Sequence, residues 1–163
     1  MKKLILIRHG KSSWKYDVED MYRPLKSVGE ANTIKVCKTF LEMSEISLKN
    51  VFSSPSKRTR DTCEIFIKNY SNPDKIEPQI IQNLYDFEGR KLVQFIKSLD
   101  NDLDTVFIFG HNNALTNFVN AYGDFYIENV PTSGLVVLEF LIDNWSDLSK
   151  GSIKLKLFPK ELI

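Results

Sequence analysis

The chain has little of two residue types that often carry chemistry, since its 163 residues include only two cysteines and two histidines. Cys37 and Cys63 show no CxxC pattern and no spacing with histidine that would suit zinc, and both fall in helix-like segments. We therefore expect two reduced, partly buried thiols, with no disulfide, no bound metal and no cofactor. Because histidine is so scarce, the places where the two histidines occur are informative.

The chain also lacks a charge excess and a long apolar run. Lysine and arginine total 22 against 21 aspartates and glutamates, so no overall field would gather nucleic acid or an anionic membrane surface. The apolar start, Leu4 to Ile7, is too short for a signal peptide and stops at Arg8. We expect one domain over residues 1–163, in the cytoplasm, as a monomer or weak dimer, with no nucleic-acid or membrane partner.

Short β-rich runs alternate with amphipathic helical patterns along the first two thirds of the chain. The β-rich runs are Lys3 to Arg8, Asn50 to Ser53, Ile76 to Ile81, Thr105 to Gly110, Leu135 to Ile142 and Ser152 to Phe158. The helical patterns are Ser27 to Met43, Ser56 to Tyr70, Gly89 to Leu99 and Asn112 to Tyr122. Since a parallel crossover needs a helix to return the chain, this order predicts an α/β fold with a doubly wound, mostly parallel sheet flanked by helices.

Two of the runs are apolar almost throughout. Leu4 to Ile7 and Val106 to Phe109 have the composition of strands that are covered on both faces, so we place them at the centre of the sheet. The last two runs, joined by the polar stretch around Asn144 to Gly151, resemble a hairpin and are expected at an edge.

Each histidine directly follows one of these two central strands and stands beside a glycine. The local sequences are IRHG, with His9, and FGHN, with His111. In such sheets ligands bind beyond the carboxyl ends of the strands, which would bring the two imidazoles to one site. The alternative is that both are core or surface histidines whose ring nitrogens are satisfied by backbone groups.

A third strand end, in VFSSPSKRTRDT, supplies a positive charge. Ser56 can cap a helix whose first turn contains Arg58. A cation at a helix N-terminus opposes the helix dipole, which indicates a bound anion that compensates. The alternative is a surface arginine that is present only for its helix propensity.

These residues together predict a phosphate pocket. Arg8 and Arg58 would hold phosphoryl oxygens, and His9 would be the nucleophile, with its second ring nitrogen held by a backbone carbonyl. His111 would donate a hydrogen bond to the phosphoryl group, and Ser12 would add a hydroxyl.

Three segments, LILIRHGKSSW, SSPSKRTRDT and FGHNNAL, resemble the signatures of the histidine phosphatase superfamily, also called the phosphoglycerate mutase-like superfamily. The KSSW, YRPLKSVGE and PTSGLVVLEF stretches are similar to its SixA-type phosphohistidine phosphatases. This resemblance implies a nucleophilic His9, a phosphate pocket of Arg8, Arg58 and His111, and hydrolysis through a phosphohistidine intermediate without metal.

A general acid is harder to identify. The family members that act on esters keep a carboxylate in the loop after the third strand, where this chain has NLYDFEG. Asp86 is the first candidate and Glu88 the second, although both can equally be turn and cap residues for the helix beginning near Gly89. A weak acid favours a phosphoramidate, whose leaving imidazole needs less help than an alkoxide.

The pocket is expected to be open, because only the segment Lys15 to Leu25 is placed to flank its mouth. Arg23 in this segment is a candidate for orienting the substrate, or else a loop arginine. An open pocket suits phosphohistidine presented by another protein, and we predict a phosphatase for that substrate. The alternatives are a phosphatase for a small phosphate monoester, a mutase, which is disfavoured because it needs a closed pocket, and a phosphate-binding module without turnover.

Overall fold

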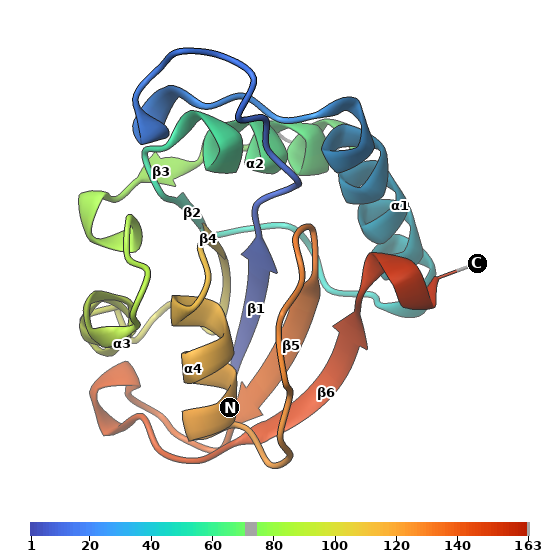
Figure 1. Cartoon of the computed structure of the whole chain (residues 1–163). Helices are drawn as coiled ribbons and strands as arrows, with labels where there is room; N and C mark the ends of the chain where they lie inside the picture. The colour runs from blue at the N-terminus through green and yellow to red at the C-terminus, as the bar shows by residue number, and fades with distance from the viewer. Residues whose placement is uncertain (71–74, 163) are drawn as a thin grey trace.

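One six-stranded sheet with helices on both faces organises the chain (Figure 1). The structure is a computed structural model that describes residues 1–70 and 75–162. The strands are β1 (Lys2–Arg8), β2 (Val51–Ser53), β3 (Gln79–Ile80), β4 (Thr105–Gly110), β5 (Leu135–Phe140) and β6 (Ser152–Leu157). The helices are α1 (Ser27–Met43), α2 (Lys57–Asn69), α3 (Arg90–Lys97) and α4 (Ala114–Tyr122), and four short 3-10 turns are η1 (Asp20–Tyr22), η2 (Gln82–Leu84), η3 (Trp145–Asp147) and η4 (Pro159–Glu161).

The strand order is β3-β2-β4-β1-β5-β6. The first four strands in this order are parallel to their neighbours, whereas β5 runs antiparallel to β1, and β6 antiparallel to β5. The expected α/β fold with a mostly parallel sheet is therefore confirmed, with β1 and β4 side by side at its centre and the β5–β6 hairpin at one edge. The third strand is shorter than the run Ile76 to Ile81, because β3 pairs only with β2 and both its side chains are exposed.

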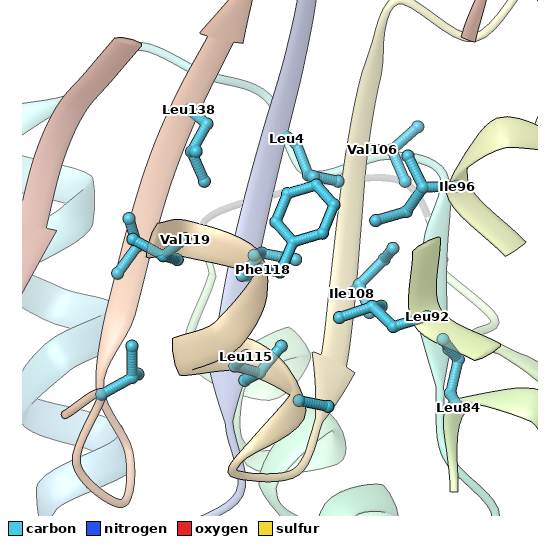
Figure 2. Close-up of a cluster of buried hydrophobic side chains, with 14 of the residues drawn as sticks. Leu4, Leu84, Leu92, Ile96, Val106, Ile108, Leu115, Phe118, Val119 and Leu138 are labelled. Carbon is cyan, nitrogen blue, oxygen red and sulfur yellow. The ribbon is translucent and has the colours of Figure 1, made fainter. Parts of the chain in front are cut away.

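Helices α3 and α4 cover one face of the sheet. Alternate side chains of the central strands, such as Leu4 and Ile108, point to this face and meet Ile96 of α3 and Phe118 of α4 (Figure 2). The near-continuous apolar sequence of β1 and β4 is explained by this arrangement, because each strand is buried on both sides.

Helices α1 and α2 cover the opposite face. Phe107 of β4 packs there against Phe40 of α1 and Phe66 of α2. Cys37 and Cys63 lie in the same layer, and both are free thiols that are buried completely rather than partly. Burial raises the pKa of each thiol to about 12.

The carboxyl ends of β1, β2 and β4 meet at one end of the sheet. Arg8 lies opposite Gly110 in the parallel β1–β4 ladder, so the next residue of each strand is a histidine. The chain then turns at Gly10, where a Cβ atom would lie 2.9 Å from the carbonyl oxygen of Gly29 in α1, so only glycine allows this close approach.

In the two described stretches of chain, no helix is both long and apolar enough to cross a membrane.

Candidate active site

The two histidines come together beyond the ends of the central strands. The ring centroids of His9 and His111 are 5.3 Å apart and the rings are tilted by 58°. Both side chains are buried, with 7% of His9 and 1% of His111 exposed. The amide of His9 still donates to the Gly110 carbonyl at 3.1 Å, so the β1–β4 ladder fixes the start of both loops.

His9 is held in the form that a nucleophile requires. Its Nδ1 lies 2.8 Å from the carbonyl oxygen of Gly10, and because a carbonyl can only accept, Nδ1 carries the proton and Nε2 keeps its lone pair. Burial, reinforced by the charges of Arg58 and Arg8, lowers the pKa of His9 to about 3 despite the opposing effect of the Gly10 bond. The ring is therefore neutral near pH 7. Gly10 is thus the source of the backbone carbonyl that the sequence could not identify.

His111 is enclosed by aromatic rings and hydroxyls. The ring centroids of Phe87 and Tyr85 lie 4.7 and 5.3 Å from its own. Its Nε2 is 2.8 Å from the Ser54 hydroxyl and 3.4 Å from that of Thr59. Burial, and then the neighbouring His9 and Arg58, lower the pKa of His111, so this ring is also neutral.

Two arginines reach the same place from different elements. Arg8 is the last residue of β1, and its Nη1 donates to the Val130 carbonyl at 2.9 Å. Arg58 lies in the first turn of α2, which Ser56 caps by accepting a hydrogen bond from the Thr59 amide, as the sequence predicted. Although only 1% of Arg58 is exposed, its charge is paired, because its Nη2 donates to the Asp20 carboxylate at 2.9 Å, and its Nη1 donates to the Asp20 backbone carbonyl at 2.7 Å.

Three buried nitrogens at this site have no hydrogen-bond partner. They are Nε of Arg8, Nε of Arg58 and Nδ1 of His111, and no other buried side-chain nitrogen or oxygen of the described residues is left unpaired. Buried polar groups are nearly always satisfied in folded proteins, so three unpaired nitrogens in one site indicate a ligand that accepts hydrogen bonds. Two of them belong to guanidinium groups, which suit an anion with several oxygens.

Arg23, in the segment Lys15 to Leu25, lies close enough to His9 for its charge to act on that ring. Arg23 is buried, and its Nη1 donates to the Ser12 hydroxyl at 2.6 Å. Its Nε donates to Asp20 at 3.0 Å, and its guanidinium carbon lies 3.6 Å from the centre of the exposed Trp14 ring. The structure thus brings Ser12 and Arg23 together beside the pocket of the two histidines.

The residues of the pocket lie in the part of the chain that matches a known protein family. The sequence profile of the histidine phosphatase superfamily (branch 1) matches residues 4–114, which include both histidines as well as Arg8 and Arg58. The chain belongs to the histidine phosphatase superfamily. No curated protein sequence gives a significant match.

Solved structures of several phosphatases share the fold over nearly their whole length. The protein histidine phosphatase SixA complexed with tungstate superposes with a TM-score of 0.80, at 16% identity, with 98% of each chain covered. A protein proposed to be the phosphohistidine phosphatase SixA of Agrobacterium tumefaciens gives 0.78, at 19% identity over 96% of this chain and 97% of that one. A phosphoserine phosphatase from Entamoeba histolytica, in complex with 3-phosphoglyceric acid, gives 0.65, at 13% identity over 96% of each chain.

Asp86, the first candidate for a general acid in this histidine phosphatase, makes the contacts of a helix-capping residue. Its carboxylate accepts hydrogen bonds from the amides of Glu88, Gly89 and Leu92, at 3.0, 3.1 and 3.0 Å, and so caps α3. Burial alone would raise the pKa of Asp86, but these amide bonds outweigh it and lower the pKa. A carboxylate held in its ionised form is poorly suited to donate a proton, and the alternative role as a turn and cap residue accounts for its contacts. Glu88, the second candidate, is exposed.

Asp20 is a residue of the site that the sequence did not predict. Asp20 joins Arg58 to Arg23 and also accepts a hydrogen bond from the hydroxyl of Tyr85. Partial burial opposes the charged form, but the bonds from these three donors outweigh it and lower the pKa of Asp20. The one available signal was the spacing in DMYRPL, where an acid stands three residues before Arg23, as in an ion pair across one helical turn.

Proposed function

We propose that this histidine phosphatase removes the phosphoryl group from phosphohistidine on another protein, without metal, by forming a phosphohistidine at its own His9. The observation that carries the proposal is the set of three unpaired buried nitrogens on Arg8, Arg58 and His111, next to a neutral His9 whose Nε2 has no hydrogen-bond partner among the described residues. Such a cradle binds the oxygens of a phosphoryl group and leaves one nitrogen to attack the phosphorus.

In the first step His9 Nε2 forms a bond to phosphorus as the bond between phosphorus and the substrate imidazole breaks. The leaving imidazole takes a proton from solvent, and His9 becomes phosphorylated. In the second step water attacks phosphorus as the bond between phosphorus and Nε2 breaks. One proton of the water goes to solvent, the other leaves with inorganic phosphate, and His9 is again neutral with its proton on Nδ1. Charge that develops on the phosphoryl oxygens in both steps is stabilised by the N–H groups of Arg8 and Arg58.

The choice of a phosphoramidate over an ester rests on the state of Asp86. An alkoxide leaving group needs a proton donor that contributes about 10²- to 10⁴-fold in rate. Asp86 is occupied by three backbone amides, which favours a substrate whose leaving group needs no carboxylic acid. The SixA structures with which the fold superposes bear the names of protein histidine and phosphohistidine phosphatases, which supports the same substrate class.

The test compares rates on a phosphohistidine-bearing protein and on a panel of phosphate monoesters, with the His9→Ala variant as the blank. We expect a strong preference for phosphohistidine and labelled phosphate trapped on His9 in acid-free quench. Preference for one small ester would replace the proposed substrate, and tight phosphate binding with no turnover would indicate a binding module. Equal turnover by the wild type and His9→Ala would overturn the mechanism.

A further inference from the structure

Ser54 touches His111, although no step above uses it. It follows β2 directly, at the same end of the sheet as both histidines, and none of it is exposed. Its Oγ lies 2.8 Å from Nε2 of His111 and 3.3 Å from the amide nitrogen of Ser56. A buried hydroxyl with these two partners can determine which nitrogen of the imidazole carries the proton.

The protons can be counted. The Ser56 amide donates to Ser54 Oγ, so this contact leaves the single hydroxyl proton of Ser54 free. The other partner of that oxygen is His111 Nε2, and the proton has an acceptor only if Nε2 is the unprotonated nitrogen. The hydroxyl of Thr59 lies 3.4 Å from the same nitrogen and can donate to it when it accepts from the Ser56 hydroxyl, 2.7 Å away.

The opposite arrangement leaves the Ser54 proton unsatisfied and puts a lone pair where an anion needs a donor. If Nε2 donated to Ser54, the serine proton would have no acceptor among the contacts of the described residues. Nδ1 of His111, buried and without a partner, would then present a lone pair instead of an N–H. A lone pair repels phosphoryl oxygens, whereas an N–H binds them.

We propose that Ser54 is a positioning residue that holds neutral His111 as its Nδ1–H tautomer, so that this N–H is available to the phosphoryl group. The inference deepens the proposed function and rests on it for the identity of the ligand. It does not rest on it for the tautomer, which is a property of the free protein.

The first test needs no variant at the serine. Since the chain has only two histidines, a long-range proton–nitrogen NMR spectrum of the labelled wild-type protein near pH 7 contains two imidazole patterns. The His9→Ala variant identifies the pattern of His111. We expect the Nδ1–H pattern for His111, and an Nε2–H pattern in the wild type would overturn the proposal.

The second test compares two neighbouring serines. Ser53 is also fully buried, and its hydroxyl donates to the Ser54 carbonyl at 2.9 Å without contacting His111, so Ser53→Ala is a matched control for Ser54→Ala. We expect Ser54→Ala to lower kcat/KM by about 10- to 100-fold, as when the partner that orients a functional histidine is removed, and to change the His111 pattern. Ser53→Ala should leave the pattern in place and keep most of the activity.

The outcomes separate the two claims. Equal losses of activity in both serine variants, or an Nδ1–H pattern that persists in Ser54→Ala, would overturn the role of Ser54. Absence of phosphatase turnover in the wild type would instead count against the proposed function, and the NMR result would still decide the tautomer.

Discussion

Replacing Asp86 with alanine separates a structural from a catalytic role for this carboxylate. Its two oxygens accept hydrogen bonds from three backbone amides at the start of α3, so the alanine variant leaves these amides without their acceptor. Removing a helix-capping side chain costs about 0.5–2 kcal/mol, and the three bonds place Asp86 in the upper part of that range, at about 1–2 kcal/mol. For a chain of this size each kcal/mol shifts Tm by about 2–4 °C, which predicts a decrease of about 2–8 °C.

The assay pairs thermal unfolding with turnover on a phosphate monoester. We expect the stability loss together with a change in kcat of less than about tenfold, because a cap supplies no proton to the leaving group. Glu88→Gln is the control, since that side chain is exposed, and it should leave Tm close to that of the wild type. A fall in kcat of about 100-fold or more with an unchanged Tm would refute the reasoning and make Asp86 the acid.

The pH dependence gives the same prediction a second check. The folded-state pKa of Asp86 is lowered, so its contribution to stability is complete above the usual carboxyl pKa and is lost as the pH falls through the folded value. The difference in unfolding free energy between the wild type and Asp86→Ala should therefore be full near neutral pH and shrink in acid. A difference that grows on acidification would contradict the capping role.

The remaining predictions concern the pocket itself. His9→Ala should abolish turnover and retain part of the phosphate affinity, whereas Arg58→Ala should lose both, as measured by kinetics and by calorimetric titration with phosphate. Asp20→Asn should weaken phosphate binding about tenfold, because charge-assisted bonds that orient Arg58 are lost. Asp17→Asn is the matched control, since it makes the same charge change on the same segment, and it should leave phosphate binding unchanged. Equal effects of the two variants would show that only net charge matters. Because the pKa of His9 is about 3 when folded and about 6.5 when unfolded, stability should fall as the pH drops through this interval, and denaturant unfolding should show a flatter dependence for His9→Ala; identical curves would contradict a neutral, buried His9.

The fold was largely accessible from the sequence because its signals are local. The uninterrupted apolar runs that became β1 and β4 and the helical stripe of α1 mark elements that are buried on both faces or on one. The ends of β3 were less accessible, because an exposed edge strand with one partner has no burial pattern to define it.

The site was accessible only in part, for a related reason. His9, His111 and Arg58 could be predicted because each comes shortly after the end of a strand. In a parallel sheet these ends meet at one edge, so the three side chains lie close together. The bonds of Asp20 to Arg58 and Tyr85 span 38 and 65 residues of sequence, and no local pattern indicates which side chains such a loop acid will meet. The competing uses of Asp86 could not be ranked from sequence because they depend on where its oxygens point.

The paired strands beneath the two histidines have a consequence for how such a protein can be redesigned. The separation of the rings follows from the spacing of β1 and β4, whereas Trp14, Arg23 and Phe87 stand on the connections around the pocket. Connections tolerate substitution and changes of length far better than central strands do. New substrate preferences can therefore be sought by exchanging residues 14–25 and 82–89 as cassettes that keep Asp20 and Asp86, while the distance between the two imidazoles stays fixed by the sheet.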